Sequence, residues 1–100
     1  MLRVEFHSNG NPVVMRIEGR LVGTFAEDAR SLVLAKKIPE GLIVDLSELS
    51  YVDVVGEDVL RWLARMGCQF IPGNTYSSYI CKSLGLPLVR NGRRNAVSAE

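Results

Sequence analysis

The side chains that could do chemistry in this sequence are few and scattered. Nucleophilic catalysis needs a nucleophile, a base and a group that orients the base. The single histidine, His7, is expected on the outward face of an edge hairpin, where it is solvated. Neither the glycine-rich dinucleotide fingerprint nor the phosphate-binding loop GxxxxGK[ST] is present. The sequence therefore predicts a protein that is not an enzyme and needs no cofactor.

Two aspartates, Asp45 and Asp53, invite comparison with an acidic pair or half of a metal site. Asp45 lies inside an apolar segment, and no other ligand type is placed to complete a coordination sphere. Asp53 stands before a predicted helix, where aspartate more often orders a loop by accepting backbone N–H hydrogen bonds. Cys68 and Cys81 lack the spacing of a zinc site or a disulfide framework, so buried, reduced thiols are expected. No metal site is predicted.

Length and charge limit the number of domains and the kinds of partner that the sequence allows. One hundred residues, 47% of them hydrophobic, suit one domain with a single core. Residues 90–100 carry a net charge of +2, which leaves about −1 for residues 1–89. We therefore expect a domain at 1–89 and a disordered basic tail at 90–100, with no basic surface for nucleic acid. No apolar run reaches the roughly 18 residues of a membrane span, and no secretory signal is evident, so a cytoplasmic protein is expected.

The first two elements predicted are the strands of a hairpin. Apolar and polar residues alternate over residues 2–7 and 13–18, and the Asn-Gly pair at residues 9–10 favours a tight turn between them. A turn centred there pairs residues whose numbers sum to nineteen, with apolar side chains on one face. In that register Arg3 opposes Arg16 on the other face. That face is expected to be wet or only partly covered.

Helices and short strands alternate in the rest of the chain. Thr24 and Glu27 have the spacing of a capping box, and Trp62 is expected in the core or at its margin rather than in an interface. The apolar run at residues 41–46 is typical of a parallel strand covered on both faces. The predicted helices cover residues 24–37, 56–66 and 75–85, and further strands are predicted at 68–71 and 86–89. This order predicts an α/β domain with a mixed β-sheet and helices packed against it.

The junction between the strand at residues 41–46 and the helix that starts at Gly56 is the candidate functional site. A strand end that leads into a helix exposes backbone N–H groups and the positive end of the helix dipole. Glu57 follows Gly56 in the first turn, where an acidic side chain is favourable. Such a junction can hold an anion, or it can present a short loop to a protein partner.

Several segments resemble the STAS domain, the family of bacterial anti-sigma factor antagonists that also forms the cytoplasmic domain of sulfate transporters. They are RIEGRL at residues 16–21, LIVDLSELSYVDVVG at 42–56, CQFI at 68–71 and SLGL at 83–86. The resemblance covers about residues 1–89 and implies a mixed sheet with helices mainly on one side. It also implies a protein-binding switch. In sporulation-type members a partner that is both kinase and anti-sigma factor phosphorylates a serine or threonine immediately before the loop glycine, and the added charge releases the complex.

This chain departs from the family pattern at its functional positions. Asp53 and Gly56 match, but Val54 and Val55 stand where the family has small hydroxyl residues. Val55 occupies the phosphoacceptor position and has no hydroxyl to phosphorylate. Val22 replaces an aspartate associated with partner contact. Ser47 and Ser50 are alternative acceptors, although serines in such a loop are usually turn formers.

The resemblance implies a non-catalytic interaction domain whose partner is an anti-sigma factor, a serine-kinase-like protein or another signalling protein. Two alternatives stay open: a module that senses an anion, nucleotide or lipid at the helix start, and an accessory subunit of a transporter or larger signalling complex. The residues expected to contact the partner are Val22, Gly23, Thr24, Asp53, Val54, Val55, Gly56 and Glu57.

Overall fold

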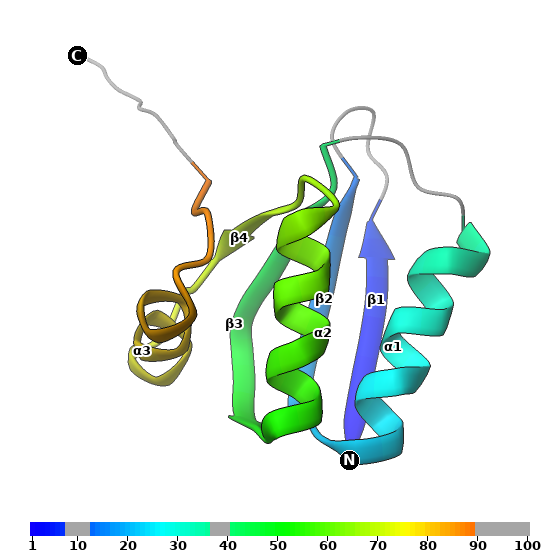
Figure 1. Ribbon diagram of the computed structural model, residues 1–100, viewed down its shortest axis with the longest axis horizontal. Coiled ribbons are helices and arrows are strands. Elements are labelled where there is room, and N and C mark those ends of the chain that lie inside the picture. The colour runs from blue at the N-terminus through cyan, green and yellow to red at the C-terminus, as the bar shows by residue number, and fades with distance from the viewer. Residues whose placement is uncertain (8–12, 37–40, 90–100) are drawn as a thin grey trace.

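The structure, a computed structural model, describes residues 1–7, 13–36 and 41–89. Within these residues an initial hairpin is followed by alternating helices and strands (Figure 1). The elements are β1 (Leu2–His7), β2 (Val14–Leu21), α1 (Gly23–Lys36), β3 (Ile43–Val52), α2 (Val54–Arg65), β4 (Gln69–Ile71) and α3 (Thr75–Leu84). The basic tail expected at residues 90–100 lies outside the described residues.

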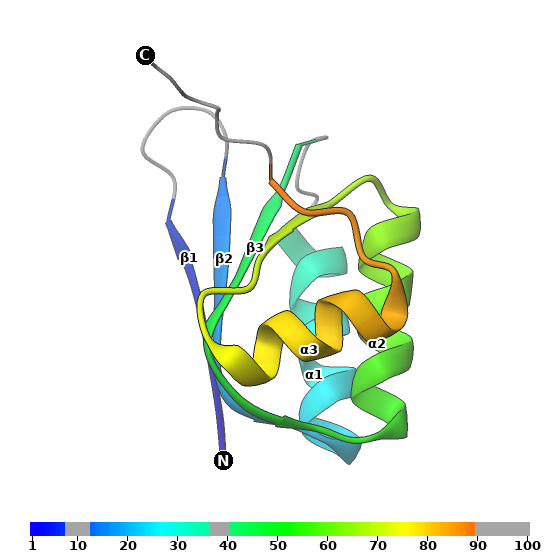
Figure 2. The ribbon, with the colours of Figure 1, turned by 90° about the vertical axis from the view of Figure 1, so that its left-hand side faces the viewer.

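The four strands form one mixed sheet in the order β1-β2-β3-β4. β1 is antiparallel to β2, whereas β2, β3 and β4 run parallel to one another. Figure 2 views the sheet nearly edge-on, with α1, α2 and α3 all on the same side of it. The predicted α/β architecture, a mixed sheet with helices mainly on one side, is confirmed.

The core lies between the helices and the inner face of the sheet. The prediction that residues 41–46 are covered on both faces was wrong: Val44 and Leu46 are buried, but Ile43 and Asp45 point to the open face and are only partly buried. An apolar run alone cannot distinguish these cases. The fully buried core side chains include Met15, Ile17 and Leu21 of β2, Val44 and Leu46 of β3, Val59, Leu60 and Leu63 of α2, and Phe70 of β4.

The register of the hairpin differs from the prediction by two residues. Val4 pairs with Ile17, so paired residues sum to 21 rather than nineteen, and the connection at residues 8–12 lies outside the described residues. Because side chains alternate with period two, a shift of two residues leaves the same faces inward, and the hydrophobic pattern cannot detect it. In the observed register Arg3 opposes Glu18 rather than Arg16, so the charges across the two strands are complementary.

β3 extends to Val52, well beyond the predicted end at residue 46. Ser47 and Ser50, expected in a loop, therefore lie within the strand. The pairing of β3 with β2 shifts register twice, and Leu46, Leu49 and Val52 are all buried at a spacing of three. A β-bulge adds a residue to one strand and so breaks the alternation of faces. That broken alternation is why the sequence pattern indicated a loop.

Two further boundaries differ from the prediction. α2 begins at Val54 rather than Gly56, so both valines of the expected loop are helical. The strand predicted at residues 86–89 is reduced to one bridge between Phe70 and Leu88, beside hydrogen bonds from Phe70 N to the Pro87 carbonyl (2.9 Å) and from Val89 N to the Phe70 carbonyl (3.0 Å). This segment nevertheless covers the outer edge of β4.

Candidate functional site

The carboxylate of Asp53 lies between the starts of two helices. As the N-cap of α2, its Oδ1 accepts a hydrogen bond from Gly56 N at 2.9 Å. Its Oδ2 accepts a hydrogen bond from Gly23 N, at the start of α1, at 3.1 Å. An anionic acceptor is favourable at a helix N-terminus because unpaired N–H groups and the positive end of the dipole meet there. Asp53 therefore orders its own loop, as expected, and also joins that loop to α1.

The capping box predicted at Thr24 and Glu27 was wrong. α1 begins at Gly23, so Thr24 lies inside its first turn. Gly23 has a φ of 49°, a left-handed conformation that glycine adopts without steric strain. The acceptor at this helix start comes from Asp53, 30 residues later in the chain. A local sequence pattern carries no information about so distant a partner.

Gly56 allows α2 to begin directly against the end of β2. A Cβ added there would overlap the carbonyl oxygen of Leu21 and lie 2.8 Å from Cγ1 of Val52. Asp53 N also donates to the Leu21 carbonyl, at 3.4 Å. The glycine is buried, and its lack of a side chain sets how closely helix and strand approach.

The structure brings residues 22–24 and 53–57 together through the Asp53–Gly23 hydrogen bond, and we call this combined region the junction surface. Val54 is its most exposed apolar side chain, with 72% of its surface accessible. Thr24 is also exposed, whereas Val55 is half-buried and packs against the core. The apolar part of the junction surface is therefore supplied mainly by Val54.

Sequence reasoning missed Tyr76 and Asn74, which fasten α3 to β3. The Tyr76 hydroxyl accepts a hydrogen bond from Val52 N at 2.9 Å, one residue before Asp53. The side-chain amide of Asn74 donates to the Ser47 carbonyl at 2.7 Å and to the Leu49 carbonyl at 3.3 Å. These bonds satisfy backbone groups that the bulges of β3 free from the sheet. Asn74 is also the N-cap of α3, where its Oδ1 accepts a hydrogen bond from Ser77 N at 2.7 Å.

The two alternative phosphoacceptors differ in access. Ser47 is partly buried, and Gly73 approaches so closely that an added Cβ there would overlap the Ser47 side chain. Ser50 is exposed on β3. Tyr51 follows Ser50, and the centroid of its ring lies 5.3 Å from the guanidinium carbon of Arg20 on β2. This cation–π pair adjoins the junction on the open face of the sheet, where no simple motif indicates it.

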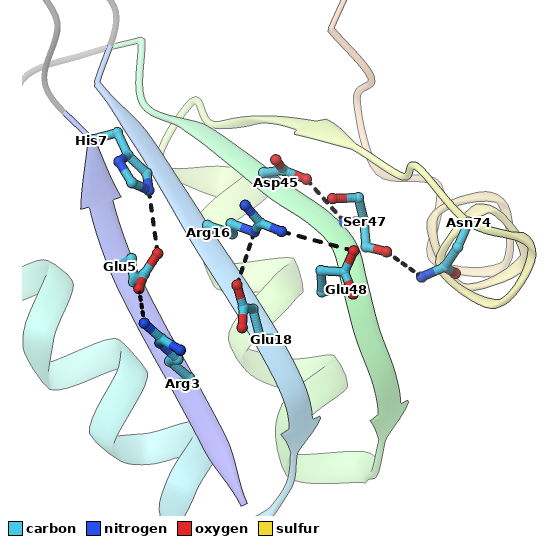
Figure 3. A network of polar contacts seen from close by, with 9 residues as sticks. All are labelled: Arg3, Glu5, His7, Arg16, Glu18, Asp45, Ser47, Glu48 and Asn74. Atoms are coloured by element: carbon cyan, nitrogen blue, oxygen red, sulfur yellow. Dashed lines mark hydrogen bonds and ion pairs between the residues drawn. The ribbon is translucent and has the colours of Figure 1, made fainter.

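The open face of the sheet carries a layer of charged side chains (Figure 3). Arg3 pairs with Glu5 at 2.6 Å, Glu5 lies 3.4 Å from His7, and Arg16 pairs with Glu18 at 3.0 Å. The hydrogen bond from Arg3 lowers the pKa of the Glu5 carboxyl, which is charged at neutral pH. His7 is solvated, as expected.

Asp45 and Asp53 do not form a joint site. Asp45 Oδ1 accepts a hydrogen bond from Ser47 N at 2.9 Å, near the start of β3, whereas Asp53 follows its far end. Eight residues of strand separate them by roughly 20–25 Å. Among the described residues, no three or more His, Cys, Asp or Glu side chains gather as metal ligands. The two aspartates thus order separate pieces of backbone.

The two cysteines are free and buried. Burial raises the pKa of both thiols, that of Cys68 to about 11. Burial therefore favours the protonated thiol over the thiolate, which is the reactive form. They act as small apolar core residues, as the sequence predicted.

No helix among the described residues is both long and apolar enough to cross a membrane. No family model matches the sequence, and no curated protein matches it. Solved structures, in contrast, do match the chain.

One similar structure is that of the anti-sigma factor antagonist SpoIIAA in its unphosphorylated form. It is 14% identical with a TM-score of 0.64, and the match covers 98% of this chain and 90% of that one. Another is a protein of the DUF3478 family with a SpoIIAA-like fold from Shewanella loihica PV-4, which is 10% identical with a TM-score of 0.56 and covers 92% of this chain and 88% of that one. The chain therefore has the SpoIIAA-like fold that its resemblance to the STAS domain predicted.

Proposed function

We propose that this protein is a non-catalytic regulatory domain that binds a protein partner through the junction surface. The observation that carries the proposal is the Asp53 carboxylate, which fixes the starts of α1 and α2 to each other. Two separate chain segments thereby form one rigid surface with the exposed side chain of Val54 at its apolar centre. An apolar side chain on a preordered surface favours association because little conformational entropy is lost on binding. The SpoIIAA-like fold supports a role of this kind.

The same geometry disfavours an anion sensor, the other use of such a junction. The carboxylate of Asp53 already accepts from Gly56 N at the start of α2 and from Gly23 N at the start of α1, so an incoming anion would have to compete with it for these two donors. Glu57 adds a second negative charge in the first turn. An incoming anion would therefore meet repulsion as well as competition for its donors.

Binding at this surface is not controlled by phosphorylation at the family position. Val55 has no hydroxyl, and its half-buried side chain packs against the core. We therefore propose a constitutive complex in the cytoplasm, with an anti-sigma factor, a serine-kinase-like protein or another signalling protein. A transporter or a multi-component complex is the alternative, and the partner's identity separates the two.

Affinity capture from the native host, followed by mass spectrometry, tests the proposal with the variant Val54→Asp. Val54 is preferable to Val55 because an acidic residue is well tolerated in an exposed first helical turn. Tyr79→Asp is the matched control, since Tyr79 is an exposed aromatic residue on α3. V54D should lose the captured protein by more than about tenfold, and Y79D should retain it. Equal capture by V54D and the unmodified protein would show that the junction is not the interface.

A further inference from the structure

The two edges of the sheet differ in whether another segment of the chain covers them. The edge of β4 is covered by residues 87–89, which bond to Phe70. β1 forms the other edge, and none of the hydrogen bonds among residues 1–7, 13–36 and 41–89 crosses its outer side. An exposed edge presents unpaired N–H and C=O groups that can pair with another strand. β1 is therefore open to strand addition within the described part of the chain.

The sequence of β1 is complementary to itself in one antiparallel register. Residues opposite each other across antiparallel strands point to the same face, so the numbers of two paired residues in a β1–β1 contact must have an even sum. A sum of eight places Arg3 opposite Glu5 of the second copy, Leu2 opposite Phe6, and Val4 on the two-fold axis. A sum of six would place Arg3 opposite itself, and a sum of ten would do so for Glu5. Of these three registers, only the sum of eight pairs opposite charges.

The charges of β1 are accessible on the open face, as Figure 3 shows. The side chain of Arg3 is 66% exposed and that of Glu5 is 31% exposed. They already form an ion pair within one copy. In the register of eight, the four side chains of two copies alternate in sign around the axis, whereas like charges opposite each other would repel.

A flank of α1 supplies an apolar contribution beside the same edge. Lys36 lies over the ring of Phe6 on β1, with Nζ 5.0 Å from the centroid. Leu32 and Phe25 precede Lys36 by four and eleven residues and so share this flank of the helix. They are 42% and 44% exposed, so this flank offers apolar surface beside the edge strand.

The opposite flank of α1 is already in use within one copy. There the guanidinium of Arg30 lies 5.6 Å from the ring centroid of Trp62 on α2. Phe25 and Leu32 are therefore on the side of α1 away from α2 and beside the open edge of the sheet, whereas the exposed Leu34 lies near Arg30 on the other side of the helix.

We propose that two copies of this chain associate through their β1 strands, antiparallel and with paired residues summing to eight, into one continuous sheet. Both helix layers then lie on the same side of that sheet, because paired residues share a face. The flank of α1 that carries Phe25 and Leu32 extends the contact on that side. A two-fold arrangement is closed, so it gives a dimer rather than a fibre.

Sedimentation velocity with charge variants tests the contact. Arg3→Glu places four negative charges around the axis and Glu5→Arg four positive ones, so each should weaken dimerisation at least about tenfold. The double variant R3E/E5R restores the alternation and should recover dimerisation. Arg61→Glu makes the same charge change at an exposed ion pair on α2 and should leave the dimer intact. A protein that is monomeric at all concentrations, or a dimer unaffected by R3E, overturns the proposal.

Cysteine cross-linking tests the register without changing charge. Val4 meets its own symmetry mate, so Val4→Cys should oxidise readily to a disulfide-linked dimer. Leu2→Cys is the control, because the two Leu2 positions lie roughly 14 Å apart along the strands, too far for a disulfide. The native Cys68 and Cys81 are buried and do not compete. Cross-linking of L2C equal to or greater than that of V4C excludes this register.

Discussion

At the scale of single residues, the carboxylate of Asp53 has two functions that differ in how far they reach along the chain. Its Oδ1 caps α2 through Gly56, three residues away, and its Oδ2 bonds Gly23, 30 residues away. Both acceptor oxygens are therefore used, each by a backbone N–H that would otherwise lack a helical partner. Removal of the carboxylate leaves two helix starts unsatisfied at the same time.

We expect Asp53→Ala to lower the free energy of unfolding by about 2 kcal/mol, because helix caps and charge-assisted hydrogen bonds contribute roughly 1–2 kcal/mol each and are not fully additive. Asp53→Asn keeps one carbonyl oxygen, which can cap α2, but offers an amide group towards Gly23 N. Asp53→Asn should therefore lower the free energy of unfolding by about half as much as Asp53→Ala does. Urea denaturation at neutral pH measures both changes.

Asp58→Ala is the matched control for Asp53. Asp58 lies on the exposed side of α2, where its ion pair with Arg61 (3.2 Å) contributes little. Asp58→Ala should therefore change the free energy of unfolding by less than about 0.5 kcal/mol. If D53N is as stable as the unmodified protein, the bond to Gly23 does not stabilise the junction.

The two bonds of Asp53 also separate what the sequence can predict from what it cannot. The cap of α2 follows from residue types three positions apart, so local chemistry suffices to predict it. The start of α1 was assigned to Thr24 because the rule for capping boxes is local. The true acceptor lies beside Gly23 because the pairing of β2 with β3 brings the two loops together.

At the scale of elements, the position of α2 depends on its contact with the end of β2. Gly56 lies where a methyl group would overlap the Leu21 carbonyl and press on Val52. The pattern of the sequence indicates a glycine that shapes a loop, whereas in the structure it sets a helix–strand distance. The bulges of β3 likewise become visible only through a contact between elements. Ser47 and Ser50 break the period of two in the sequence, and only the pairing with β2 shows that the strand continues.

Gly56→Ala should therefore destabilise the protein by about 2–3 kcal/mol, although alanine has the higher helix propensity by about 1 kcal/mol. Overpacking dominates because the Leu21 carbonyl belongs to a buried strand and cannot move aside. Thermal and chemical denaturation measure the loss.

Gly67→Ala provides the comparison for this substitution. Gly67 follows α2 with a φ of 95° and has no neighbour within 4 Å of an added Cβ. Gly67→Ala should lower the free energy of unfolding by only roughly 1–2 kcal/mol, the cost of a left-handed backbone conformation for a residue with a side chain. A G56A protein more stable than the unmodified one would mean that helix and strand are not in close contact at this point.

At the scale of the whole molecule, the junction surface and the open β1 edge are separate. The junction lies where α1 and α2 begin, and β1 runs along the side of the sheet (Figure 1). The order of elements could be predicted because it follows from alternation and connection rules. That the helices lie mainly on one side was what the resemblance to the STAS domain implied. The hairpin register could not, since a shift of two residues preserves the pattern. That register decides which charges of β2 lie opposite the charges of β1.

An antiparallel contact through β1 places the two junction surfaces at opposite ends of the continuous sheet. Each is then accessible, so the dimer should bind two copies of the protein partner, and native mass spectrometry should detect a 2:2 complex. The monomeric variant R3E should bind one copy with an affinity within about threefold of the dimer's affinity per site. V54D should dimerise normally but bind no partner. If R3E loses the partner as completely as V54D does, the two surfaces are coupled, and partner binding requires the second copy.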